Sequence, residues 1–204
     1  MALDRFTKAA LLIVDMQNDF VRVGAPMEVP QARDTIPQHR QLIEHFRKSR
    51  LPIVYTRFLA GPERRLLWEF SPKLAPPILA CHAGHKRLYA DIHKTLECIE
   101  IIDELAPNPE DVVIDKLGYG AFHRTKLDDT LRERGVESLI VTGTVTQICV
   151  EETAREAFHY GFRTTIVSDA VSSFAPDLHA ATLKNFAMKF GWVADSADLL
   201  RRLD

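Results

Sequence analysis

Residues 10–15 read Ala-Leu-Leu-Ile-Val-Asp, a short apolar run that ends in a carboxylate. Such a run is typical of a strand buried on both faces, as strands of parallel sheets are. Asp15 would then lie at the carboxyl end of the strand, the edge at which open α/β sheets bind their ligands. This stretch therefore predicts an α/β fold and the place of its functional site.

Further short runs rich in β-branched residues repeat the pattern. They are Ile53–Thr56, Val112–Ile114, Leu139–Thr142 and Thr165–Val167. Each is followed, at once or after a loop, by a segment with helical spacing, which is the rhythm of a parallel sheet covered on both faces. The expected helices begin near Asp34–Pro37 and after Ser196, or span about Lys126–Arg134, Gln147–Tyr160 and Leu178–Phe190. Gly135 and Gly161 stand where a helix end favours a left-handed residue.

The composition excludes several classes of protein. A chain of 204 residues with 46% hydrophobic residues and a net charge of -2 is expected to form one domain, residues 1–204, without a basic surface for nucleic acid. The charged N-terminus does not resemble a leader, and no run reaches the roughly 18 apolar residues of a membrane span. We therefore expect a cytoplasmic protein whose three cysteines are free thiols and whose partner is a small molecule.

The segment from Gly61 to about Thr95 interrupts the strand and helix rhythm. It is rich in proline and also carries aromatic and histidine side chains. Long irregular segments inside compact domains are usually functional or disordered, so we interpret residues 61–95 as a lid. The alternative is a surface excursion that closes a dimer.

Three reactive side chains follow predicted strands: Asp15, Lys116 and Cys149. Because the carboxyl ends of parallel strands form one edge, all three are expected to face the same site. Cys149 would lie in the first turn of a helix, where the dipole and a nearby lysine favour the thiolate. Asp15 can act as general acid and base, while Lys116 lowers the thiol and carboxylate pKa values.

Each of these residues also has an ordinary structural interpretation. A lone cysteine is usually buried and inert, an aspartate after a strand often caps a turn, and a lysine is often solvated. Those interpretations do not explain why the residues fall at strand ends on the same edge. Cys81 and Cys98 lack such neighbours and are predicted to be dispensable.

Three blocks of the sequence resemble the signature blocks of the isochorismatase-like cysteine hydrolases, in order. They are Ile-Val-Asp-Met-Gln-Asn-Asp-Phe at 13–20, Asp-Lys-Leu-Gly-Tyr-Gly-Ala-Phe at 115–122 and Thr-Gly-Thr-Val-Thr-Gln-Ile-Cys-Val at 142–150. The resemblance implies a three-layer α/β/α fold with a six-stranded parallel sheet, and a triad of Asp15, Lys116 and Cys149. It also implies a cis peptide at Val145–Thr146, with the backbone N–H groups of Val145 and Cys149 forming an oxyanion hole.

The resemblance narrows the expected chemistry. A cysteine at position 149 favours amide cleavage over vinyl-ether cleavage. Nicotinamidases usually carry metal-binding residues after the second strand, but Tyr55–Ala60 contains none, so we expect no metal and no other cofactor. His82 and His85 form an H-x-x-H pair, but without a nearby carboxylate pattern they are not expected to bind a metal.

The sequence is similar to the branch that cleaves ureido and N-carbamoyl amides, including biuret hydrolase, triuret hydrolase and N-carbamoylsarcosine amidohydrolase. We expect Phe20 to wall the substrate pocket and Gln147 and Arg57 to contact a urea-like group, although Gln147 can equally be an ordinary helix residue and Arg57 an exposed arginine. Two alternatives stay open: a metal-independent nicotinamidase-like hydrolase, and a catalytically silent, thiol-sensing protein. The family also suggests a homodimer or homotetramer.

Overall fold

The computed structural model describes residues 6–61 and 65–203 and contains the predicted six-stranded sheet, in which all paired strands are parallel. The strands, in the order in which they pair, are β5 (Val112–Lys116), β2 (Ile53–Phe58), β1 (Ala9–Val14), β6 (Ser138–Thr144), β7 (Arg163–Ser172) and β8 (Trp192–Ala194). The strands predicted from sequence are confirmed, and β8 is not among them. Each is longer than expected, most of all β7, which has ten residues where Thr165–Val167 was expected. Met1–Arg5, which include most of the charged N-terminus, lie outside the described residues.

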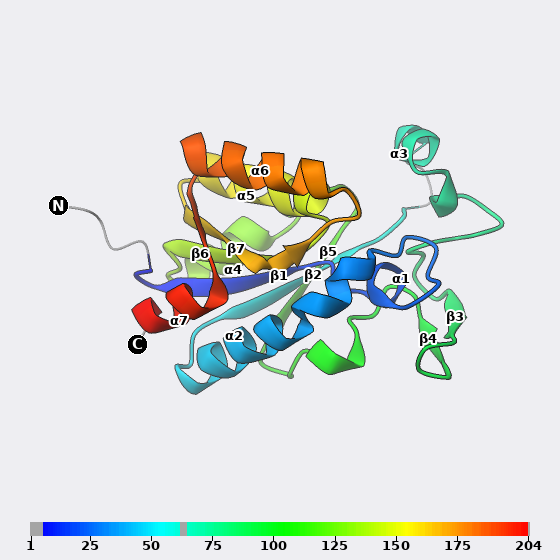
Figure 1. The fold of residues 1–204 in the computed structure, drawn as a ribbon, viewed down its shortest axis with the longest axis horizontal. Helices are drawn as coiled ribbons and strands as arrows, with labels where there is room; N and C mark the ends of the chain where they lie inside the picture. Colours follow the sequence, from blue (N-terminus) through cyan, green and yellow to red (C-terminus); the bar gives the residue numbers. More distant parts are fainter. Residues whose placement is uncertain (1–5, 62–64, 204) are drawn as a thin grey trace.

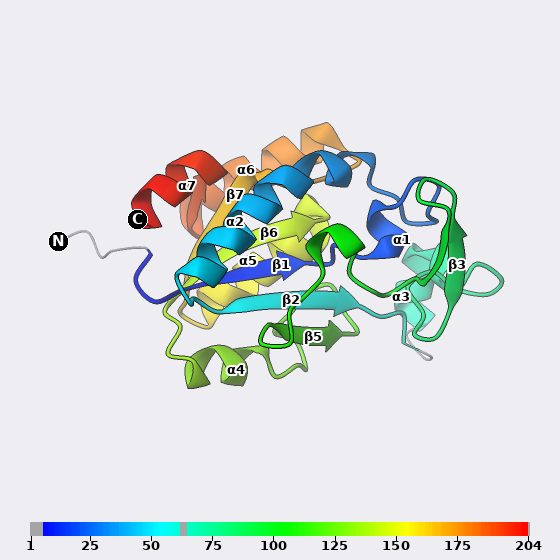
Figure 2. The ribbon, with the colours of Figure 1, turned by 90° about the horizontal axis from the view of Figure 1, so that it is seen from below.

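Helices cover both faces of this sheet (Figures 1 and 2). One face carries α2 (Ile36–Lys48) and α7 (Ser196–Leu203), and the other carries α4 (Leu127–Glu133), α5 (Glu151–His159) and α6 (Pro176–Lys189). The alternation of side chains along β1 divides the core accordingly. Leu11 and Ile13 pack in the first cluster, whereas Leu12 and Val14 pack in the second, so β1 is buried on both sides.

The helix boundaries follow local sequence signals. Pro37 lies in the first turn of α2, where its missing N–H costs nothing. Gly135 and Gly161 follow α4 and α5 with φ angles of +66° and +85°, as predicted for helix ends. The helix expected at 147–160 is divided: a π-helical turn, η4 (Thr146–Val150), precedes α5. No helix of the described chain is long and apolar enough to cross a membrane.

The segment 61–95 is less irregular than the sequence suggested. It contains a short helix, α3 (Arg65–Phe70), a 3₁₀ turn, η2 (Pro72–Leu74), and the strand β3 (Lys86–Tyr89), which forms a hairpin with β4 (Lys94–Glu97). These elements and α1 (Asn18–Val21) lie beyond the carboxyl ends of the sheet strands (Figure 2). Their position above that edge means that they shape whatever site lies there.

Strands β1 and β6 lie unusually close together at their carboxyl ends, where Val14 pairs with Gly143. Gly143 pairs with Val14 next to a shift of register between β6 and β7, and its φ angle is +107°. A Cβ at this position would lie 2.0 Å from the carbonyl oxygen of Val14 and 2.6 Å from its nitrogen. Only glycine therefore allows β6 to approach the residue that precedes Asp15.

We predict that Gly143→Ala destabilises the fold by about 3 kcal/mol, since backbone strain and the Val14 clash combine. Gly135→Ala is the matched control, because Gly135 also has a positive φ angle, but a Cβ there would meet no atom within 4 Å. The control should lose only about 1 kcal/mol. Urea unfolding measures both values, and equal losses would contradict the importance of the β1–β6 contact.

Candidate active site

Asp15 is held at the end of β1 by its neighbour in β2. Its side chain is fully buried, and its φ angle is +51°. The hydroxyl of Thr56 donates a 2.6 Å hydrogen bond to Oδ1 of Asp15 and accepts one from the Asp15 backbone N–H at 3.2 Å. Thr56 therefore fixes both the carboxylate and the backbone that carries it.

Lys116 meets this carboxylate from the end of β5. Its Nζ lies 2.7 Å from Oδ2 of Asp15, and both side chains are 0% exposed. The ammonium also donates to the carbonyl oxygens of Gly118, at 3.2 Å, and Tyr119, at 2.9 Å. Burial lowers the pKa of Lys116, but the attraction of Asp15, and then of Cys149, outweighs burial and raises it. Lys116 is therefore a permanent cation at neutral pH.

Cys149 completes the group from the π-helical turn η4, and its residue is 3% exposed. Burial raises the pKa of the thiol to about 12; Lys116 lowers it, and Asp15 raises it further. The sequence-based expectation of a lowered thiol pKa is thus wrong, because desolvation of the thiolate outweighs the attraction of one lysine. At neutral pH Cys149 is therefore an uncharged thiol, close to the carboxylate of Asp15 and the ammonium of Lys116.

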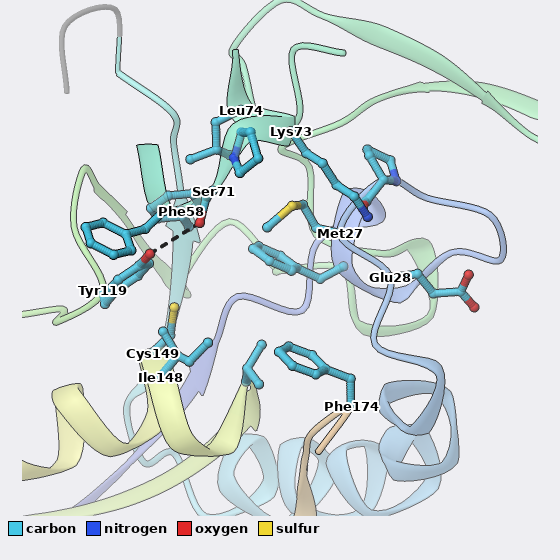
Figure 3. Close-up of a pocket in the computed structure, with 15 residues that line it drawn as sticks. Met27, Glu28, Phe58, Ser71, Lys73, Leu74, Tyr119, Ile148, Cys149 and Phe174 are labelled. Atoms are coloured by element: carbon cyan, nitrogen blue, oxygen red, sulfur yellow. Dashed lines mark hydrogen bonds between the residues drawn. The ribbon is translucent and has the colours of Figure 1, made fainter. Parts of the chain in front are cut away.

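A cavity of about 500 Å³ opens onto Cys149 (Figure 3). Asp15 and Lys116 do not line it but lie buried behind the thiol. An aromatic wall adjoins the sulfur: the ring centroid of Phe58 is 6.3 Å from that of Phe20 and 6.1 Å from that of Tyr119. Of the reactive residues, only the thiol is thus presented to a ligand.

Of the three residues predicted to contact substrate, only one lines the cavity. Phe20 lines the cavity as expected. Arg57 does not, because its guanidinium binds Asp115 and Glu100, each at 2.7 Å. Gln147 is also outside the lining, and its side-chain amide is buried without a hydrogen bond to the described residues. The structure therefore brings together Phe20 and the predicted triad but not Arg57 or Gln147.

The backbone turn before the nucleophile differs from the expectation by one residue. The cis peptide lies at Thr144–Val145, not at Val145–Thr146. Val145 alone separates β6, which ends at Thr144, from η4, which begins at Thr146, so the cis bond directly follows the strand instead of directly preceding the helical turn. Val145 and Cys149 both line the cavity, as an oxyanion hole built from their N–H groups requires.

Several site residues were not predicted. Thr56 has a signal in the sequence, because a hydroxyl at the end of a buried strand needs a polar partner. Phe58 and Phe174 line the cavity but have no distinguishing pattern, whereas Tyr119 lies in the second signature block, 115–122. His82 stands apart from the triad: its Nε2 lies 2.8 Å from the carbonyl oxygen of Leu74, and its ring lies beside Trp68. Among the described residues no cluster of three His, Cys, Asp or Glu is placed to hold a metal.

Comparison with known proteins identifies relatives of this arrangement. The isochorismatase domain model matches residues 9–198. Nicotinamidase 3 of Arabidopsis thaliana is 33% identical over 95% of this chain and 87% of its own. The ureidoacrylate amidohydrolase RutB of Stutzerimonas stutzeri is 30% identical over 92% of this chain and 79% of its own. A cysteine hydrolase from Pseudomonas syringae pv. phaseolicola superimposes with a TM-score of 0.85 at 28% identity, over 96% of this chain and 92% of its own.

We predict that iodoacetamide labels Cys149 before Cys81 or Cys98, because only Cys149 lines the cavity. The pKa of Cys98 is also raised to about 12 and that of Cys81 well above its usual value, so access and not acidity decides the order. The rate at Cys149 should rise about tenfold per pH unit from pH 7 to 9, since only the thiolate reacts.

Peptide mapping at limiting reagent measures this order and this slope. Asp15→Asn should not slow the labelling, because Asp15 raises the thiol pKa, although it should abolish turnover. A rate that levels off near pH 7 would contradict the raised pKa.

Proposed function

The chain belongs to the isochorismatase family of hydrolases, and we propose that it cleaves the C–N bond of a small amide through a covalent intermediate on Cys149. The observation that carries the proposal is the buried contact of Asp15 with Lys116 directly behind a thiol that opens onto a cavity. Such a grouping supplies a nucleophile, a proton acceptor and a fixed positive charge.

The raised thiol pKa favours general-base attack. In the proposed first step the sulfur of Cys149 bonds to the carbonyl carbon while its proton passes to Asp15. The oxygen becomes an oxyanion, which the N–H groups of Val145 and Cys149 receive. The C–N bond then breaks, and the proton on Asp15 passes to the departing nitrogen. Ammonia departs, and the acyl group remains bound to Cys149 as a thioester.

Water completes the cycle. The water molecule loses a proton to Asp15 as its oxygen attacks the thioester carbon. The C–S bond then breaks, and Asp15 passes this proton to the sulfur of Cys149. Lys116 stays charged throughout, since its pKa is raised, and holds Asp15 in place between the two half-reactions. The products are ammonia, a carboxylic or carbamic acid and the free thiol.

For the substrate we propose a ureido or N-carbamoyl amide, of which biuret is the simplest type. The relative named for ureidoacrylate supports this class. The nicotinamidase relative supports a second candidate, an aromatic carboxamide cleaved by the same residues without metal. A catalytically silent, thiol-sensing protein is the third alternative, and the buried ion pair beside the thiol argues against it.

We predict that the wild-type protein releases ammonia from a panel of ureides and carboxamides and that Cys149→Ala does not. Mass spectrometry during turnover should find an acyl or carbamoyl adduct on the Cys149 peptide. EDTA should leave the rate unchanged; a loss that zinc or manganese reverses would show that a metal takes part. Full activity in Cys149→Ala, or no activity on any amide, would refute the proposed function.

We also propose that residues 1–204 act as one domain, with segment 61–95 as a lid or an interface in a homodimer or homotetramer. The exposed side chains of Leu66 (69%) and Leu88 (67%) in this segment support an interface, since exposed large apolar side chains are covered on association. Light scattering should report a mass above the 23.1 kDa of one chain. A fully active particle of that mass would contradict the assembly.

A further inference from the structure

The cavity that opens onto Cys149 is apolar along most of its wall. Aromatic rings and aliphatic side chains form the lining, including Phe20, Met27, Phe58, Leu74, Ile148 and Phe174. Around Cys149 in Figure 3, the side chains of Ile148, Tyr119 and Phe58 surround the sulfur, and Phe174 and Met27 extend the apolar surface away from it. A small, wholly polar urea would leave most of this surface in contact with water.

The charged side chains of the lining already have partners. Lys73 donates to the carbonyl oxygen of Pro26 at 2.5 Å. Glu28 accepts from the backbone N–H of Gly24 at 2.8 Å and pairs with Arg33 at 2.8 Å. Its carboxylate points away from Cys149 in Figure 3. The charge of Glu28 is thus balanced by Arg33, whereas Lys73 keeps its positive charge, because a carbonyl oxygen accepts a hydrogen bond without neutralising an ammonium.

Two aromatic side chains of the lining are exposed. Phe174, which follows β7, is 56% exposed, and Phe70, at the end of α3, is 81% exposed. These two rings continue the apolar wall of the cavity to the surface of the protein. An apolar group on a bound ligand would cover them and remove them from water. A cavity of about 500 Å³ also has room for more than the reacting amide.

From these observations, and resting on the proposed function, we propose that the amide or ureide substrate, unlike biuret itself, carries an extended apolar group, larger than a single ring, on the part that the enzyme retains. The reacting carbonyl lies at Cys149, and the apolar group lies along Phe58 and Met27 toward Phe174. Phe174 is then a specificity-determining residue that touches only the distal part of the substrate.

Turnover of matched amides tests the proposal. Acetamide, butyramide, hexanamide, benzamide and 4-phenylbutyramide, with their N-carbamoylamine counterparts, share the leaving ammonia and differ in apolar length. We expect KM to fall about fourfold per added buried methylene while kcat changes little, because burial stabilises ground and transition states alike. A preference for biuret over all apolar substrates would overturn the proposal.

Substitution at the mouth supplies the second test. Phe174→Ala should raise KM for 4-phenylbutyramide about tenfold and leave that for acetamide unchanged. The matched control is Phe158→Ala, since Phe158 is 43% exposed but lies outside the cavity lining. This control should change neither constant. Equal effects of Phe174→Ala on both substrates would refute its role in specificity.

A labelling experiment separates this inference from the proposed function. Chloroacetamide and its N-hexyl and N-(2-phenylethyl) derivatives alkylate Cys149 without any amide hydrolysis, and their rates with a free thiol in solution correct for intrinsic reactivity. We expect the two apolar derivatives to label Cys149 at least tenfold faster than chloroacetamide, with saturation. If the apolar derivatives label Cys149 faster but the protein hydrolyses no amide, only the catalytic proposal is refuted. If chloroacetamide and its apolar derivatives label Cys149 at equal corrected rates, the apolar site is refuted.

Discussion

The buried ion pair of Asp15 and Lys116 is the constraint on which the site depends. Two charges with no exposed surface lie 2.7 Å apart at the ends of β1 and β5, which are separated in the sheet by β2. Removing one partner from such a pair typically costs about 3–5 kcal/mol, because the other charge stays buried. The relative position of three strand ends is thus set by an interaction that the proposed mechanism also uses, and Thr56 of the middle strand bonds to the same carboxylate.

The sheet could be predicted from the sequence because its strands are buried on both faces. Continuous apolar runs such as Ala10–Val14 and Leu139–Thr142 have few alternative structures, and parallel order places Asp15, Lys116 and Cys149 on one edge. Strand β8 has only three residues and a partly exposed surface, so no comparable signal marks it. The hairpin β3–β4 was missed because each strand has only four residues, and Lys-Arg-Leu-Tyr and Lys-Thr-Leu-Glu do not alternate polar with apolar side chains.

The common sheet edge of Asp15, Lys116 and Cys149 was predictable from the sequence, but the protonation of Cys149 was not. Helix position and a nearby lysine argue for a thiolate, whereas the observed burial of Cys149 argues for a thiol with a pKa of about 12. Burial is a property of the whole fold and has no local pattern. The same limit applies to Arg57, whose carboxylate partners Asp115 and Glu100 come from distant parts of the chain. The cavity wall, too, is built from residues that only the fold brings together.

Asp19, four residues after Asp15, has a consequence for how such a protein can diverge. Its buried carboxylate accepts hydrogen bonds from the hydroxyl of Tyr89 at 2.7 Å, the guanidinium of Arg87 at 3.1 Å and the backbone of Cys81 at 2.9 Å. Asp19 thus anchors segment 61–95 at the edge of the sheet, while the Asp15–Lys116 pair lies buried at the strand ends. Substitutions at exposed positions of this segment, such as Leu88, leave these contacts of Asp19 unchanged. The exposed surface above the sheet can therefore vary while the segment stays attached to α1.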